Sequence, residues 1–315
     1  MDALANELIA FVSAIYRGAT YCFRSGDTAW NCANAASSGA LTGLVYGLSA
    51  LGLSVIFGVI RIVNFAHGEI MVLGMYFALV MFNWLGIDPL LSVPAAALLM
   101  FGFGYGLQAA VISRVAHLPD HMQFLLLAAL AIMLVSGCLL VFGPDPQSAN
   151  VSYALDSFAV GKLFIDKTKV YAAIAAMLVA AILLAFFKYT ATGKAIRACA
   201  DNRLGAKVVG LNVDRLYALT FGIGAACLGA AGCIILPLIE LRPYLAPSYT
   251  LLAFVIVIIG GLGSLPGALL GGILIGLSED LAALWEPSYK TAFSFALLIF
   301  VLLLRPQGLL GRARH

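Results

Sequence analysis

The chain contains long runs of residues without a charged side chain, and these runs constrain its fold more than any other feature. Two of them, Val170–Phe187 and Leu216–Ile239, flank one strongly charged segment, Lys188–Arg215. An apolar run of about 20 residues is long enough to cross a membrane as a helix. Only 10% of the 315 residues are charged, whereas about a quarter are charged in soluble domains. The sequence therefore predicts an all-α, polytopic transmembrane bundle without a separate soluble domain.

The basic segment Lys188–Arg215 predicts how the bundle is oriented. It holds six of the 18 Lys and Arg residues, against two aspartates. Because Lys and Arg in short loops resist translocation, we expect this segment on the cytoplasmic side. Counting from it places the N-terminus outside and the basic C-terminus in the cytoplasm. We expect nine spans, at 40–60, 68–86, 90–113, 122–143, 169–188, 215–239, 249–262, 266–285 and 289–304.

The same segment is predicted to contain a short amphipathic helix. Thr192 would cap a helix that ends near Leu204, and Gly205 and Gly210 would end or turn it. Its polar face would carry Lys194, Arg197 and Asp201, and its other face Ile196, Cys199 and Ala200. One interpretation is a solvated loop that only fixes topology. The other is a rigid knob that docks on a soluble partner.

The first 39 residues are expected to differ from the rest of the chain. Residues 1–17 have an apolar side and predict an interfacial helix rather than a signal peptide. Residues 18–39 are polar and predict an outer loop. That loop would lie in an oxidising compartment, where Cys22 and Cys32 could form a disulfide. We therefore divide the chain into this segment, 1–39, and a membrane domain, 40–315.

Polar and glycine-rich stretches interrupt the spans in two places, GVIRIVNFAHGEIMVLG (58–74) and GGLGSLPGALLGG (260–272). Breaks at membrane depth are tolerated only where protein or a water-filled cavity surrounds them, and in transporters they often mark the pathway. Both breaks precede a glycine-rich helix start, which is compatible with an internal repeat. The pathway candidates are Asn64, His67, Glu69, Glu240, Gly261, Gly263, Ser264, Pro266 and Glu279. For His67 and Glu69 a structural role at the start of a helix is the alternative.

The sequence lacks the residues that several classes of function would need. No carboxylate lies near the middle of a span, which argues against a proton- or sodium-coupled carrier. The sequence has no GxxxxGK[ST] motif, no cysteines at metal-ligand spacing and no nucleophile–base pair, so we expect no ATP site, no metal site and no enzyme activity. Nothing in the charge pattern indicates nucleic acid as a partner. A passive channel would need the same polar breaks but no docking loop, and it remains the alternative.

Four stretches together resemble one family. They are NFAHGEIMVLGMYFA (64–78), ATGKAIRACADNRLGAKVVGLNVDRLYALTFGIGAA (191–226), VIVIIGGLGSLPGALLGGILIG (255–276) and SFALLIFVLLLRPQGLLGR (294–312). They are similar to the LivH-type membrane permeases of ABC importers for branched-chain amino acids. Relatives in that family carry urea, amides or other amino acids, which gives the alternative substrates. The N-terminal insertion of about twenty residues departs from the family pattern.

The resemblance implies a set of partners and a role for the basic segment. It implies a second, homologous LivM-like permease, two ATPase subunits that bind ATP and Mg²⁺, and a periplasmic solute-binding protein, in a bacterial inner membrane. The basic segment, 189–214, would be the coupling loop that docks on an ATPase subunit. Its contact and framing residues would be Gly193, Lys194, Arg197, Ala200, Asp201, Asn202 and Gly210. No cofactor is implied for this chain itself.

Overall fold

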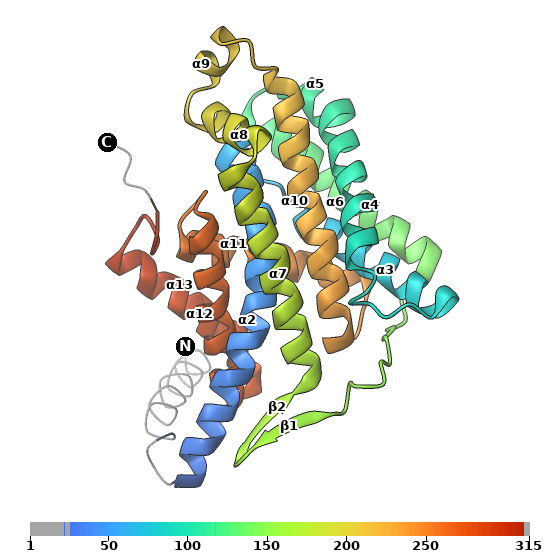
Figure 1. Cartoon of the computed structure of the whole chain (residues 1–315), viewed down its shortest axis with the longest axis vertical. Coiled ribbons are helices and arrows are strands. Elements are labelled where there is room, and N and C mark those ends of the chain that lie inside the picture. Colours follow the sequence, from blue (N-terminus) through green and yellow to red (C-terminus); the bar gives the residue numbers. More distant parts are fainter. Residues whose placement is uncertain (1–21, 23–25, 117, 312–315) are drawn as a thin grey trace, which may run out of the picture.

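The protein is a bundle of helices, nine of which, within the residues described, are long and apolar enough to cross a membrane (Figure 1). The computed structural model describes Cys22 and residues 26–116 and 118–311. The spans are α2 (Gly26–Ile60), α3 (His67–Leu85), α4 (Val93–Leu107) with the π-helical turn η1 (Gln108–Ile112) and α5 (Ser113–Val115), α6 (Asp120–Phe142), α7 (Lys167–Tyr189), α10 (Val213–Ile235) with the 3₁₀ turn η2 (Leu236–Leu238), η3 (Pro243–Leu245) with α11 (Ala246–Gly260), α12 (Leu265–Ala283) and η4 (Pro287–Tyr289) with α13 (Lys290–Leu304). The interfacial helix predicted at 1–17 lies outside the described residues.

Helix α2 begins earlier than the sequence predicted. The stretch 26–39, which we expected to be a loop, is helical and continuous with the first span. From Gly39 onward, glycines let α2 pack closely against α12. A Cβ added at Gly39 would lie 2.5 Å from the carbonyl oxygen of Gly276, and one at Gly43 would lie 2.6 Å from that of Gly272. Small residues spaced by four are a common means of close helix packing in membranes.

The extension of α2 also has polar partners. Asn34 accepts a hydrogen bond from the backbone of Phe164 at 2.9 Å, and Ser38 donates one to Asp280 at 2.6 Å. Phe164 belongs to an antiparallel hairpin of β1 (Ser157–Val160) and β2 (Leu163–Asp166), which lies beside the start of α2 (Figure 1). The sequence did not predict this hairpin. Its contacts explain why the polar residues of 26–39 occur on a helix.

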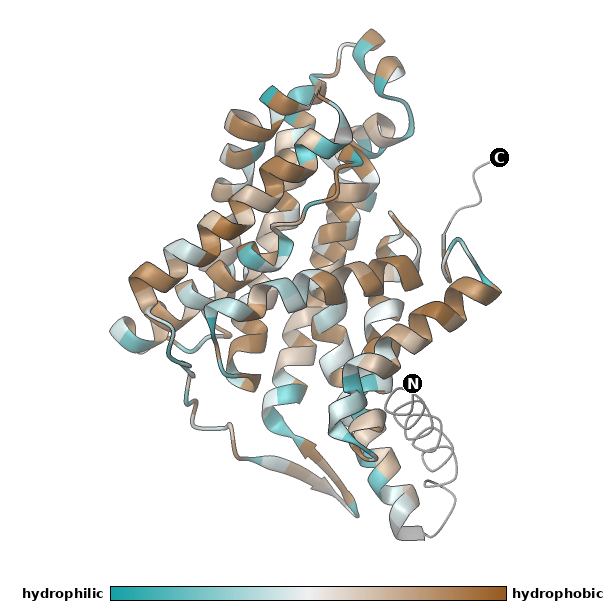
Figure 2. Ribbon diagram, turned by 180° about the vertical axis from the view of Figure 1, so that it is seen from behind, coloured by the Kyte–Doolittle hydropathy of each residue, from teal (hydrophilic) through white to brown (hydrophobic). Residues whose placement is uncertain are grey.

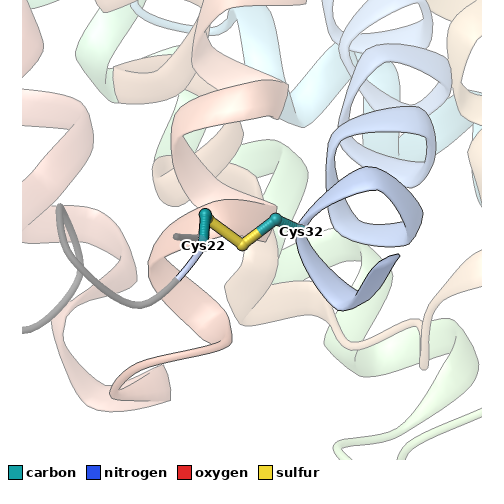
Figure 3. The surroundings of a disulfide bond; sticks show 2 residues. All are labelled: Cys22 and Cys32. Atoms are coloured by element: carbon teal, nitrogen blue, oxygen red, sulfur yellow. A yellow bond between two sulfur atoms is a disulfide. The ribbon is translucent and has the colours of Figure 1, made fainter. Parts of the chain in front are cut away.

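Cys22 and Cys32 form a disulfide, with their Cα atoms 5.8 Å apart (Figure 3). The bond joins the first turns of α2 to the chain that precedes them. This is the pairing that the sequence analysis expected, but it closes onto a helix rather than within a loop.

Helix α10 forms the centre of the bundle and α6 and α13 form part of its outside. Helix α10 packs against α2, α3 and α4, and most of its side chains are buried. On the peripheral helices, apolar side chains are exposed, such as Leu140 (89%) and Leu303 (79%). Figure 2 shows mostly brown, apolar residues along the long helices, and teal residues mainly toward their ends. Such an outside suits a hydrocarbon environment, because exposed apolar side chains carry no cost there.

Candidate functional site

The basic segment folds into two short helices at one end of the bundle, α8 (Ala191–Asp201) and α9 (Arg203–Val208) (Figure 1). The predicted cap, Thr192, is wrong. Thr190 caps α8 instead, because its hydroxyl accepts the backbone N–H of Gly193 at 3.0 Å. The same hydroxyl donates to the carbonyl of Phe186 at 2.7 Å, so one residue ends α7 and begins α8. Helix α8 therefore follows α7 without a flexible linker between them.

The two faces of α8 are as predicted. Ile196 and Cys199 are buried, whereas Lys194, Arg197 and Asp201 are exposed. Burial raises the pKa of the Cys199 thiol, so this cysteine stays a neutral thiol that packs as a small apolar group. The helix is thus attached along its apolar side and presents its charges outward.

Glycine permits the close approach of α8 to α7. A Cβ at Gly193 would lie 2.7 Å from the Cα of Phe187 and would also overlap the carbonyl oxygen of Phe186. No other residue has a side chain small enough for this position. Gly193 is therefore a packing residue and does not frame the helix as a terminator.

A second cap interrupts the predicted helix at Asn202. Its side chain accepts the N–H of Gly205 at 2.8 Å and starts α9, so the expected single helix to Leu204 is two helices. Gly205 lies within α9 and does not end α8. Gly210 has φ +86° and forms the turn that leads to α10, as predicted. Asn212 caps α10 by accepting the N–H of Arg215 at 3.0 Å.

A large cavity, about 1630 Å³, lies beside α8. Its walls come from the ends of α2 and α7, the turn between α11 and α12, and residues after α13. It brings together two groups of predicted site residues that are distant in sequence: Lys194, Arg197, Ala200 and Asp201 from the basic segment, and Gly263, Ser264 and Pro266 from the second break. Among the described residues no ion pair joins Arg197 to Asp201, although the sequence analysis allowed one.

Apart from Arg61 and Val63, which are exposed, the first break lies largely inside the protein. Residues 61–66 lead from α2 to α3, and Asn64, His67 and Glu69 are at most 4% exposed. Asn64 accepts the N–H of Ala66 at 3.1 Å, and His67 contacts the carbonyl of Ser49 at 3.2 Å. Glu69 lies in the first turn of α3, as a helix N-terminus favours.

The first break is closed by α11. Thr250 accepts the backbone N–H of Gly68 at 2.8 Å and donates to Glu69 at 3.3 Å. A Cβ at Gly68 would overlap the carbonyl oxygen of Ala246. His67 packs as the structural alternative expects, but it caps nothing.

The second break is closed by the chain that follows α13. Leu309 and Leu310 donate backbone hydrogen bonds to the carbonyls of Ile259 and Gly260, at 2.8 and 3.0 Å. Gly261 and Gly263 have φ +101° and +79°, which only glycine adopts readily. Ser264 caps α12 by accepting the N–H of Gly267 at 3.2 Å, with Pro266 in the first turn. Polar side chains thus have only a small part in this break.

The two remaining pathway candidates lie away from the cavity. Glu240 pairs with Arg242 at 2.9 Å, and both side chains are more than half exposed. Glu279 is half-buried, accepts from Ser294 at 3.2 Å and lies 4.0 Å from Lys290. The adjacent Asp280 pairs with Lys169 at 3.4 Å. Glu279 and Asp280 therefore join α12 to α13 and α7.

Sequence reasoning missed two parts of this arrangement. The close packing of α2 on α12 was signalled by glycines at positions 39, 43 and 47, spaced by four. The pairing of the chain after α13 with the second break had no signal of its own, because backbone hydrogen bonds do not depend on residue type.

Comparison with known proteins identifies relatives over most of the chain. The family model for the permease component of the branched-chain amino acid transport system matches residues 35–302. The permease LivH of Salmonella typhimurium, named for high-affinity branched-chain amino acid transport, is 33% identical over 293 residues, covering 87% of this chain and 94% of its own. BraD of Pseudomonas aeruginosa is 32% identical with the same coverage, and a probable LivH of Methanocaldococcus jannaschii is 29% identical over 84% of this chain and 88% of its own. No solved structure matches.

Proposed function

The chain belongs to the family of branched-chain amino acid transport permeases, and on that premise we propose that it forms half of the pathway of an ATP-driven importer. The other half would be a second, homologous permease. A periplasmic binding protein delivers branched-chain or other hydrophobic amino acids, and two ATPase subunits bind ATP and Mg²⁺. The relatives named for branched-chain amino acid transport support the substrate class.

The attachment of α8 carries the proposal. Ile196 and Cys199 are buried, Thr190 caps the start of α8, Asn202 caps the start of α9 directly after it, and three charged side chains point outward. A helix fixed in this way moves together with α7, so a force applied to its outer face reaches a transmembrane span. In this proposal Lys194, Arg197, Ala200, Asp201 and Asn202 meet a groove on the ATPase, and Gly193 and Gly210 set the shape of the loop.

The orientation follows from the positive-inside rule. The end with α8 and α9 would face the cytoplasm, together with the C-terminus. The N-terminus, the disulfide and the hairpin would face the opposite side of a bacterial inner membrane. A membrane-impermeant thiol reagent tests this with two single-cysteine variants, Val208→Cys and Leu155→Cys, made in a background where the other cysteines are replaced. In intact cells only Leu155→Cys should react.

Reconstitution tests which subunits are needed for transport. Proteoliposomes with both permeases, both ATPases and the binding protein should accumulate leucine when ATP is present. Proteoliposomes with this chain alone should accumulate none. Equilibration of leucine through the chain alone, without ATPase, would support a passive channel instead.

Charge reversal tests α8. Arg197→Glu combined with Asp201→Lys should weaken ATPase binding by about 30-fold or more, because breaking a desolvated charge pair costs about 2–5 kcal/mol. Uptake should fall with it. The matched control, Arg114→Glu, changes an exposed basic residue at the same end of the bundle but outside α8. Normal uptake and normal ATPase binding in the double variant would return the basic segment to a topology signal.

A further inference from the structure

The cavity beside α8 contains two basic residues, Arg61 and Lys188, that have no part in the proposed docking of an ATPase. Its lining contains four basic side chains and one carboxylate: Arg61, Lys188, Lys194, Arg197 and Asp201. No ion pair between described residues involves any of the four cations. Lys188 lies 5.2 Å from the ring of Tyr189, which leaves its charge unneutralised. An anion would therefore be attracted to this cavity.

The rest of the lining is largely apolar and comes from membrane-spanning helices. Val55, Phe57 and Val59 of α2, Leu184 and Phe187 of α7, and Ile258 of α11 contribute to it. Leu262 and Leu310 are 52% and 44% exposed. A free phosphate or a nucleotide would bury little apolar surface against these side chains. The acyl chains of a lipid would bury much more.

The order of charge and apolar surface matches the membrane boundary. Lys188 is in the last turn of the spanning helix α7, and Arg61 directly follows the end of α2. Tyr189, 70% exposed, directly follows Lys188 in the chain, and tyrosines favour the level of lipid headgroups. The cations therefore lie where phosphates of the bilayer lie, and the apolar wall begins below them.

Arg61 has a backbone conformation that fixes its position. It has φ +61°, the only positive φ of a non-glycine residue among those described. Left-handed backbone disfavours a residue with a side chain, so ordinary packing gives no reason for an arginine there. A glycine would fit the turn more easily, but it would remove one of the four cations.

From these observations we propose that the cavity binds an anionic phospholipid. Arg61 and Lys188 hold its phosphate, Lys194 and Arg197 lie farther out and stay available to the ATPase, and the acyl chains lie along α2, α7 and the turn between α11 and α12. Basic pockets between transmembrane helices recognise anionic headgroups in this way.

Native mass spectrometry on the transporter, purified with its partner subunits, tests this proposal. The complex is taken from nanodiscs of phosphatidylcholine that contain a minor fraction of phosphatidylglycerol. The wild type should retain phosphatidylglycerol in preference to phosphatidylcholine. Arg61→Gln with Lys188→Gln should lower that retention by about 30-fold. Excess inorganic phosphate or glycerol 1-phosphate should not displace the lipid, because neither contacts the apolar wall.

Two matched variants separate a specific site from a loss of fold or of general charge. Arg114→Gln with Lys207→Gln removes one arginine and one lysine at the same end of the bundle, outside the cavity, and should retain the lipid. Arg61→Lys with Lys188→Arg keeps both charges and should restore retention. Equal retention in both glutamine pairs, or displacement by inorganic phosphate, would overturn the proposal. So would crosslinking of Leu262→Cys to a partner subunit in a complex that holds no phosphatidylglycerol.

Discussion

The two breaks in the transmembrane helices are closed in different ways. At the first, the N–H of Gly68 is bonded to the Thr250 side chain, and His67 and Glu69 are buried around it. At the second, the carbonyls of Ile259 and Gly260 are bonded to the backbone that follows α13. The sequence gives both breaks a similar appearance, with a glycine-rich helix start after each. The structure makes one a side-chain arrangement and the other a backbone arrangement.

The first break therefore contains buried polar side chains, whereas the second is held mainly by hydrogen bonds between backbone groups. Backbone groups freed at membrane depth must find partners inside the protein, and both breaks meet this requirement. The first does so with ionisable and amide side chains, and Asn64 Nδ2 and His67 Nδ1 have no protein partner within the described structure. The second leaves no comparable polar side-chain atom. Of the two breaks, the first therefore holds the buried polar side-chain atoms that have no partner among the described residues.

The largest expected effect tests how tightly the first break is closed. Gly68→Ala places a methyl group against the Ala246 carbonyl and 2.7 Å from the Thr250 hydroxyl. We expect a loss of about 3 kcal/mol in unfolding free energy, because backbone on both sides cannot move apart freely. The readout is the unfolding midpoint in detergent. Gly106→Ala, on α4 with nothing within 4 Å, is the control and should unfold no earlier than wild type. Equal losses in both would mean that Gly68 only supplies flexibility.

A smaller loss of unfolding free energy is expected from a substitution at the second break. Gly308 has φ +78°, and a Cβ there would lie 2.6 Å from the nitrogen of Gly261. Gly308→Ala should cost about 2 kcal/mol, combining backbone strain with overlap. Gly86→Ala is the control, since Gly86 has φ +65° but nothing within 4 Å, and it should cost about 1 kcal/mol. If the two alanine variants unfold together, the chain after α13 does not support the break.

The smallest expected effect concerns the one side chain that serves the second break directly. Ser264→Ala removes the cap of α12 and should cost about 1 kcal/mol. Ser148, exposed in the loop before the hairpin and without a hydrogen bond to any described residue, is the control and should change the midpoint little on replacement by alanine. A loss at Ser264 as large as that at Gly68 would remove the distinction between the two breaks.

The sequence predicted most of the spans because hydropathy and charge report directly on them. It failed at 26–39, where Asn34 and Ser38 indicated a loop, since their partners Phe164 and Asp280 are remote in the chain. It placed His67 at the start of a helix but could not show that this start is fully buried. It found the polar face of α8 from periodicity but chose Thr192 over Thr190, because both are threonines suited to the same cap.

The hydrogen bonds at the two breaks can form only in a fixed order while the chain is being synthesised. When α3 enters the membrane, the residue that bonds to the N–H of Gly68 has not been made, since Thr250 follows 182 positions later. The carbonyls of Ile259 and Gly260 likewise have no partner until the chain after α13 has been made, because Leu309 and Leu310 are their donors. The first break can therefore close only after α11 leaves the ribosome, and the second only after two further helices. Until α11 has been made, the backbone N–H of Gly68 lacks the partner that it has in the folded protein.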